Sequence, residues 1–198
     1  MKTNVTTILV ENPATYLFNK YRTAAVNHIN CALDTIVANQ GNSAAIMATA
    51  DQMHEDLQQL RIIGLISERE YDAAAAITFE VLCGDNQHFV LPDVACIRDG
   101  DGKILYKLSE CKSLVRAAII ESINKCFDFL INSTESEWRE DGWETEDEYH
   151  KCIFRTVHNI MRLGKIISAT TEKDHDKVTH HMKTCIETKK FTPMKLGD

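Results

Sequence analysis

The chain has 198 residues and a formal net charge of −7, with 44% hydrophobic and 26% charged residues, ordinary values for a globular protein that buries its own core. Eight glycines and three prolines are too few for an all-β protein, which needs many turns. No segment approaches the roughly 18 consecutive apolar residues of a membrane helix, so we expect no membrane segment.

Helical periodicity predicts three helices over residues 13–82. An asparagine cap followed by Pro13 begins the first helix, whose apolar residues recur at helical spacing as far as Ile36. The second helix begins near Ser43 and carries a heptad-like seam, which favours a self-assembling structural subunit, a possible homo-oligomer, as one functional alternative. The seam consists of Ile46, Ala50, Met53, Leu57 and Leu60.

The third helix begins at a capping box formed by Ser67 and Glu70 and makes an antiparallel hairpin with the second helix. Phosphates would repel its acidic residues, which argues against a DNA-binding helix-turn-helix. The fragment from Leu57 to Tyr71 resembles the helical hairpin of small bacterial interaction modules called SHOCT domains. This resemblance rests on turn chemistry that unrelated hairpins share, and we assign no family on it.

Residues 88–108 form the only segment with a β pattern. Apolar and polar residues alternate on both sides of Asp99-Gly-Asp-Gly, and Asp-Gly between apolar runs is a strong hairpin signal. The same turn resembles the middle of a calcium-binding EF-hand loop, but Ile97 and Leu108 occupy the positions where carboxylates are required. We therefore expect a β-hairpin inserted into a helical domain, and no calcium site.

Three more helices are predicted in the second half of the chain. The fourth begins at Ser109 or Ser113 and ends near Ile131, and its wide apolar face, on which spacing places Phe129, favours a central position in the core. The fifth begins at a capping box at Thr145. The sixth has a weaker pattern, and residues 189–198 after it are expected to form a flexible tail.

The segment from Glu135 to Tyr149 holds both tryptophans and eight carboxylates against a single arginine, a net charge of −7 that equals the charge of the whole chain. Tryptophan is a common interface anchor, and charged rims direct association, so the loop at 133–145 is predicted to bind a basic partner. In the alternative, both rings fold back over the neighbouring helix ends while the carboxylates stay in solvent. The candidate binding residues are Trp138, Trp143, Glu137, Glu140, Asp141 and Glu144.

A metal-dependent or cysteine enzyme is the alternative function. His181 and Cys185 lie one helical turn apart, a workable spacing for metal ligands. However, the sequence contains no H-E-x-x-H, C-x-x-C, P-loop or G-x-S-x-G motif. We therefore assign no catalytic residue, metal or cofactor. The other histidines and cysteines of this region are His150, Cys152, His158, His175 and His180.

The sequence as a whole predicts a mainly α-helical single domain over residues 1–198, with about six helices and the β-hairpin at 88–108. The favoured function is an acidic, intracellular, non-enzymatic binding protein, such as an inhibitor, immunity protein or regulatory factor. Its partner would be a protein with a basic surface, including a nucleic-acid-binding protein, and direct binding to nucleic acid or membrane is not expected. Seven scattered cysteines, typical of reduced thiols, favour the cytoplasm.

Overall fold

The computed structural model describes residues 12–195, and these residues form seven helices and no strand. The predicted mainly α-helical fold is confirmed, and none of the described helices has the length and hydropathy needed to cross a membrane. A short helix within the acidic loop accounts for the difference from the predicted six. The helices are α1 (Pro13–Ala38), α2 (Ser43–Ile62), α3 (Glu68–Leu82), α4 (Leu108–Asn132), α5 (Glu135–Glu140), α6 (Glu146–Ile166) and α7 (Glu172–Thr188).

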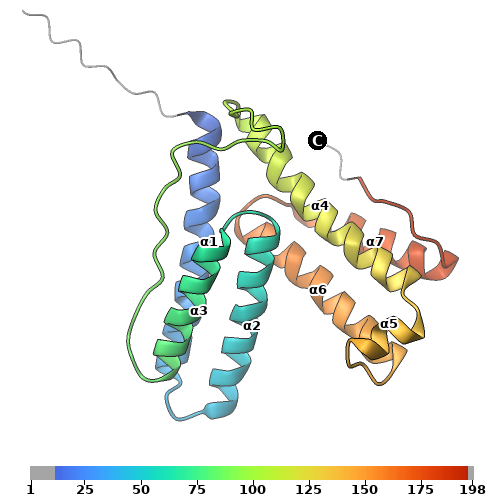
Figure 1. Cartoon of the computed structure of the whole chain (residues 1–198), viewed down its shortest axis with the longest axis horizontal. Helices are drawn as coiled ribbons and strands as arrows, with labels where there is room; N and C mark the ends of the chain where they lie inside the picture. Colours follow the sequence, from blue (N-terminus) through green and yellow to red (C-terminus); the bar gives the residue numbers. More distant parts are fainter. Residues whose placement is uncertain (1–11, 196–198) are drawn as a thin grey trace, which may run out of the picture.

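The helices form two groups that share one hydrophobic core. Helices α1, α2 and α3 contact one another and run side by side (Figure 1). In the second group α4 packs against α6 and α7, and the short α5 packs against α6. Helix α1 contacts both α4 and α6, and α2 contacts α6, so the buried side chains of both groups belong to a single cluster.

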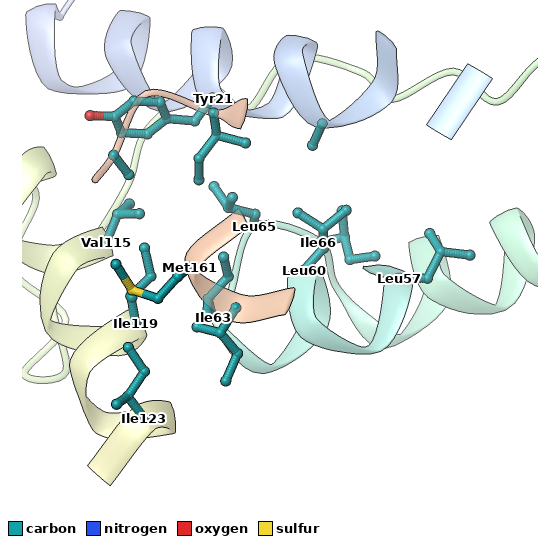
Figure 2. Packing of buried hydrophobic residues seen from close by; sticks show 14 of the residues in the cluster. Tyr21, Leu57, Leu60, Ile63, Leu65, Ile66, Val115, Ile119, Ile123 and Met161 are labelled. Atoms are coloured by element: carbon teal, nitrogen blue, oxygen red, sulfur yellow. The ribbon is translucent and has the colours of Figure 1, made fainter. Parts of the chain in front are cut away.

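The turn between α2 and α3 lies within this core. Its side chains Ile63, Leu65 and Ile66 are buried and join a cluster with residues of α1, α4 and α6 (Figure 2). Between them Gly64 adopts a φ of +74°, a conformation that side chains disfavour. The turn therefore buries three apolar residues where the helical hairpin meets α4.

The heptad-like seam of α2 is used inside the chain. Ala50, Met53, Leu57 and Leu60 are all buried, and α2 packs against α1, α3 and α6. The side chains that suggested self-assembly thus already have partners within one molecule. Formation of a homo-oligomer stays a prediction, but the seam no longer supports it because its side chains are buried within one molecule.

Three predicted helix starts are confirmed in atomic detail. The Asn12 side chain accepts a hydrogen bond from the backbone N–H of Ala14 (3.0 Å), directly before Pro13. Ser67 and Glu70 form the reciprocal capping box of α3. The Thr145 hydroxyl accepts a hydrogen bond from the Glu148 N–H (3.2 Å), but the Glu148 side chain does not return the bond, so only half of the predicted capping box forms. These caps depend on neighbouring residues alone, which is why the sequence shows them.

The predicted β-hairpin at 88–108 is wrong. The chain does reverse direction at Asp99, whose backbone N–H donates to the Lys103 carbonyl (3.0 Å). A single antiparallel bridge joins Arg98 and Ile104, but no strand extends from it among the described residues. The turn signal was therefore read correctly, whereas the pairing of two strands was not.

Side chains of α1 provide the physical reason for this difference. The Asn30 side chain accepts from the Phe89 N–H (2.8 Å) and donates to the Phe89 carbonyl (3.0 Å). Asn19 pairs in the same way with Val94 (3.0 and 3.2 Å). Each asparagine satisfies both backbone groups of one residue, as a neighbouring strand would, so Phe89 and Val94 are bound by α1 instead of by a second strand.

Candidate functional site

The acidic segment folds around the short helix α5. Thr134 caps this helix and donates hydrogen bonds from its backbone N–H (2.7 Å) and hydroxyl (2.9 Å) to the Glu137 carboxylate. Both bonds favour the charged form and lower the pKa of Glu137. Arg139 forms an ion pair with Glu135 one turn away (2.8 Å). Part of the acidity of this segment is therefore used to start and stabilise α5.

Both predicted tryptophans lie against the core. Trp138 is only 8% exposed and belongs to the hydrophobic cluster, and Trp143 is partly buried against the same cluster. The Arg139 guanidinium lies over the Trp138 ring, 5.0 Å from its centroid. The rings therefore occupy the positions expected if they fold back onto the helices, and neither projects from the surface.

A cavity of about 360 Å³ lies between the end of α4, helix α5 and the start of α6. We call it the acidic pocket, because four carboxylates line it and no lysine, arginine or histidine does. Within residues 12–195 none of these four carboxylates forms an ion pair. The lining residues are Asp128, Phe129, Asn132, Ser133, Glu137, Glu140, Asp141 and Tyr149.

The structure brings together only part of the predicted site. Glu137, Glu140 and Asp141 line the acidic pocket. Glu144 is exposed outside it, and the two tryptophans are packed beneath the surface. The predicted residues thus divide into pocket carboxylates, one solvent-exposed carboxylate and a pair of packing residues.

Phe129 is the aromatic residue of this region that sequence reasoning assigned incorrectly. Its spacing placed it on the buried stripe of α4, yet it is 59% exposed and lines the acidic pocket. The buried stripe runs instead through residues four apart, which was the signal available in the sequence. This stripe consists of Val115, Ile119, Ile123 and Phe127.

A second cavity, of about 510 Å³, adjoins the acidic pocket along α4. We call it the tail groove, because α4 forms one wall and residues 191–195 form the other. Asp128 lines both cavities, so the two are neighbours on the surface. The groove presents an apolar surface from Ala117, Ile120, Phe191 and Met194. Polar and charged residues also line it, namely Glu121, Asn124, Lys125, Asp128 and Lys195.

Two side chains, Asn124 and His181, attach the C-terminal segment beside this groove. The Asn124 side chain accepts from the Met194 N–H (2.8 Å) and donates to its carbonyl (3.2 Å). The His181 ring lies 2.7 Å from the Thr192 carbonyl oxygen. The contacts hold residues 192–194 against α4 and α7, and the flexibility of the tail stays a prediction.

The candidate metal-ligand pair, His181 and Cys185, lies beside the C-terminal segment. His181 contacts the tail, and the buried Cys185 thiol lies 3.8 Å from the Thr192 hydroxyl. In the described part of the chain no group of three histidine, cysteine, aspartate or glutamate side chains could hold a metal ion. Burial raises the pKa of the Cys111 and Cys126 thiols to about 11, which makes these two poor nucleophiles at neutral pH.

No protein-family model, curated protein or solved structure matches the chain. The chemistry of the acidic pocket therefore follows from its own geometry. Its carboxylates can accept hydrogen bonds from a guanidinium or ammonium group, and Phe129 presents an exposed ring face to a cation or to the aliphatic stem behind it. The pocket is thus suited to a lysine or arginine side chain.

Proposed function

We propose that this protein is a non-enzymatic binding protein whose acidic pocket receives a lysine or arginine side chain of a basic protein partner. One observation carries the proposal: four carboxylates without ion pairs surround a cavity that also contains an exposed phenylalanine. A lysine or arginine side chain placed there would pair with carboxylates that have no ion-pair partner among residues 12–195. The arrangement favours occupation by a cationic group over an empty pocket.

The tail groove lies next to the acidic pocket and adds apolar contacts that a partner could use. A partner segment with apolar side chains beside its basic residue would place them over Ile120, Phe191 and Met194. Apolar contacts lower the dissociation rate, whereas the surrounding carboxylates speed association. Such a partner is a basic amphipathic segment of a protein, and its binding fits an inhibitor or regulatory factor.

All seven cysteines are free, which supports a reducing compartment such as the cytoplasm.

A comparison of two triple variants tests the proposal. The pocket variant combines Asp128→Asn, Glu140→Gln and Asp141→Asn, and the control variant combines Glu144→Gln, Glu148→Gln and Glu187→Gln. Both raise the net charge by three, but only the first set lines the acidic pocket. Each is immobilised and used to capture proteins from a lysate over a series of salt concentrations.

The wild type and the control variant should capture the same basic proteins. The pocket variant should bind them about tenfold more weakly at low salt, because lost charge pairs slow association. This difference should narrow as salt screens the carboxylates. Equal loss in both variants would show that only the total charge matters, and equal retention would place the binding site elsewhere.

A further inference from the structure

A third cavity, of about 340 Å³, lies at the opposite end of α4 from the acidic pocket. It opens between α1, the turn that joins α2 to α3, residues 94–98 and the first half of α4. Its volume is within the range of about 300–1,000 Å³ that is typical of small-molecule sites. The lining residues are Phe18, Ile63, Gly64, Val94, Cys96, Ile97, Arg98, Leu114, Val115 and Ala118.

The walls of this cavity belong to the hydrophobic core. Phe18, Ile63, Ile97 and Val115 are buried residues of the main cluster, so the cavity leads from the surface to core side chains. A ligand inside it would exchange water for apolar contacts. An apolar ligand body, chain or ring, is therefore favoured there.

Arg98 is the only charged residue that lines the cavity. Its guanidinium donates one hydrogen bond to the Gly102 carbonyl (2.7 Å), and it forms no ion pair with another residue in the range 12–195. A guanidinium has five N–H donors, so several remain for a ligand. A single cation beside an apolar cavity is complementary to a ligand with a single negative charge.

We propose that this cavity binds a small amphipathic monocarboxylate, with its apolar part against the core and its carboxylate on Arg98. Arginine binds carboxylates through paired N–H donors, which gives both affinity and orientation. A polyanion such as a nucleotide would bring more charge than one guanidinium neutralises. The site shares no lining residue with the acidic pocket, so this proposal does not rest on the proposed partner binding.

Octanoate and octanol are suitable probes, because they share a chain length and differ in charge. Calorimetry should show that octanoate binds at least about tenfold more tightly than octanol, since hydrogen bonds to charged groups are the stronger kind. Arg98→Gln should remove this preference, whereas Arg98→Lys should keep part of it. The matched control is Arg69→Gln, which neutralises an exposed arginine outside the cavity.

Filling the cavity provides an independent test. Ala118→Leu adds three carbons to its lining and should abolish octanoate binding. Equal binding of octanoate and octanol, or octanoate binding that survives both Ala118→Leu and Arg98→Gln, would overturn the proposal. The absence of octanoate binding to the wild type would overturn it as well.

Cysteine labelling locates the ligand without a substitution. Cys96 lines the cavity and is exposed, and Cys31 and Cys83 are exposed thiols outside it. Saturating octanoate should slow the reaction of Cys96 with N-ethylmaleimide severalfold, as measured by mass spectrometry of peptides. Labelling of Cys31 and Cys83 should not change. If Cys96 is not protected while octanoate binds, the ligand lies elsewhere and the assignment is wrong.

Discussion

Exposure distinguishes two aromatic residues of the acidic region, Trp138 and Phe129. Trp138 is 8% exposed within the core cluster, whereas Phe129 is 59% exposed in the acidic pocket. Tryptophan is often an interface anchor, but a ring already buried in the free protein gains little contact area from a partner. The structure therefore assigns stability to the tryptophan and leaves the phenylalanine available for binding.

Truncation should reduce the stability of the fold strongly at Trp138 and very little at Phe129. Trp138→Ala should lower the free energy of unfolding by about 3 kcal/mol, because it leaves a cavity in the core. Phe129→Ala should change it by less than about 0.5 kcal/mol, as is usual for exposed positions. Urea denaturation measures both changes.

Partner dissociation provides the second measurement for this pair. Phe129→Ala should speed dissociation of a captured basic protein by about tenfold or more, because well-placed aromatic contacts act on the dissociation rate. A large loss of stability in Phe129→Ala, together with unchanged dissociation, would contradict the assignment of this residue to the binding surface.

Among the secondary-structure elements, helices bind extended segments of the chain through asparagine side chains. Asn19 and Asn30 on α1 each pair with both backbone groups of one residue in the segment 89–94, and Asn124 on α4 does the same with Met194. Helices thus hold extended segments through side chains alone. This explains how a chain with a β-like pattern remains attached to a helical core.

Removal of one such side chain should detach its segment. Asn30→Ala leaves the backbone groups of Phe89 without their partners, which should cost about 1–3 kcal/mol of stability. Hydrogen exchange at the Phe89 amide should speed up in parallel. Asn39→Ala is the control, because the Asn39 side chain bonds only within the exposed end of α1 (2.7 Å to the Thr35 carbonyl). Unchanged exchange in Asn30→Ala would show that apolar packing alone holds the segment.

At the scale of the whole molecule, Arg22 connects three parts of the chain. This arginine is 4% exposed and donates to the Leu65 carbonyl (2.6 Å), the Glu70 carboxylate (2.6 Å) and the Pro92 carbonyl (3.2 Å). It joins α1 to the α2–α3 turn, to α3 and to the segment before α4. A buried charge is tolerated there because its partners compensate for lost hydration.

The ion pair between Arg22 and Glu70 predicts a specific loss of stability in acid. Burial by itself would raise the pKa of Glu70, but hydrogen bonds from Arg22 and Ser67 outweigh it and lower the pKa from 4.5 to about 2. A carboxylate with a depressed pKa stabilises the fold above its unfolded pKa and loses this contribution as pH falls. The contribution should therefore disappear between about pH 4.5 and pH 2.

Glu70→Gln provides the measurement. The variant should be less stable than the wild type at pH 6, and this difference should shrink as the pH is lowered toward 2 in chemical denaturation. Glu68→Gln is the control, because Glu68 pairs with Arg61 at the surface, where such pairs contribute little. A difference for Glu70→Gln that stays constant with pH would refute the role of this ion pair.

Features that depend on neighbouring residues could be predicted from the order of amino acids. The caps at Asn12, Ser67 and Thr145, the approximate ranges of six helices and the turn at Asp99 were all predicted and are present. The acidity of residues 135–149 is likewise a property of composition. Local hydrogen bonds and side-chain spacing suffice for these predictions.

Contacts between groups that lie far apart along the chain depend on the three-dimensional fold. The pairing of Asn30 with Phe89 spans 59 residues, and no pattern along the chain indicated it. Asp128 of α4 and Asp141 after α5 meet in one pocket, and α5, which carries the buried Trp138, packs against α6. Periodicity along the chain predicts which face of an element is apolar. Which other element covers that face depends on packing in three dimensions.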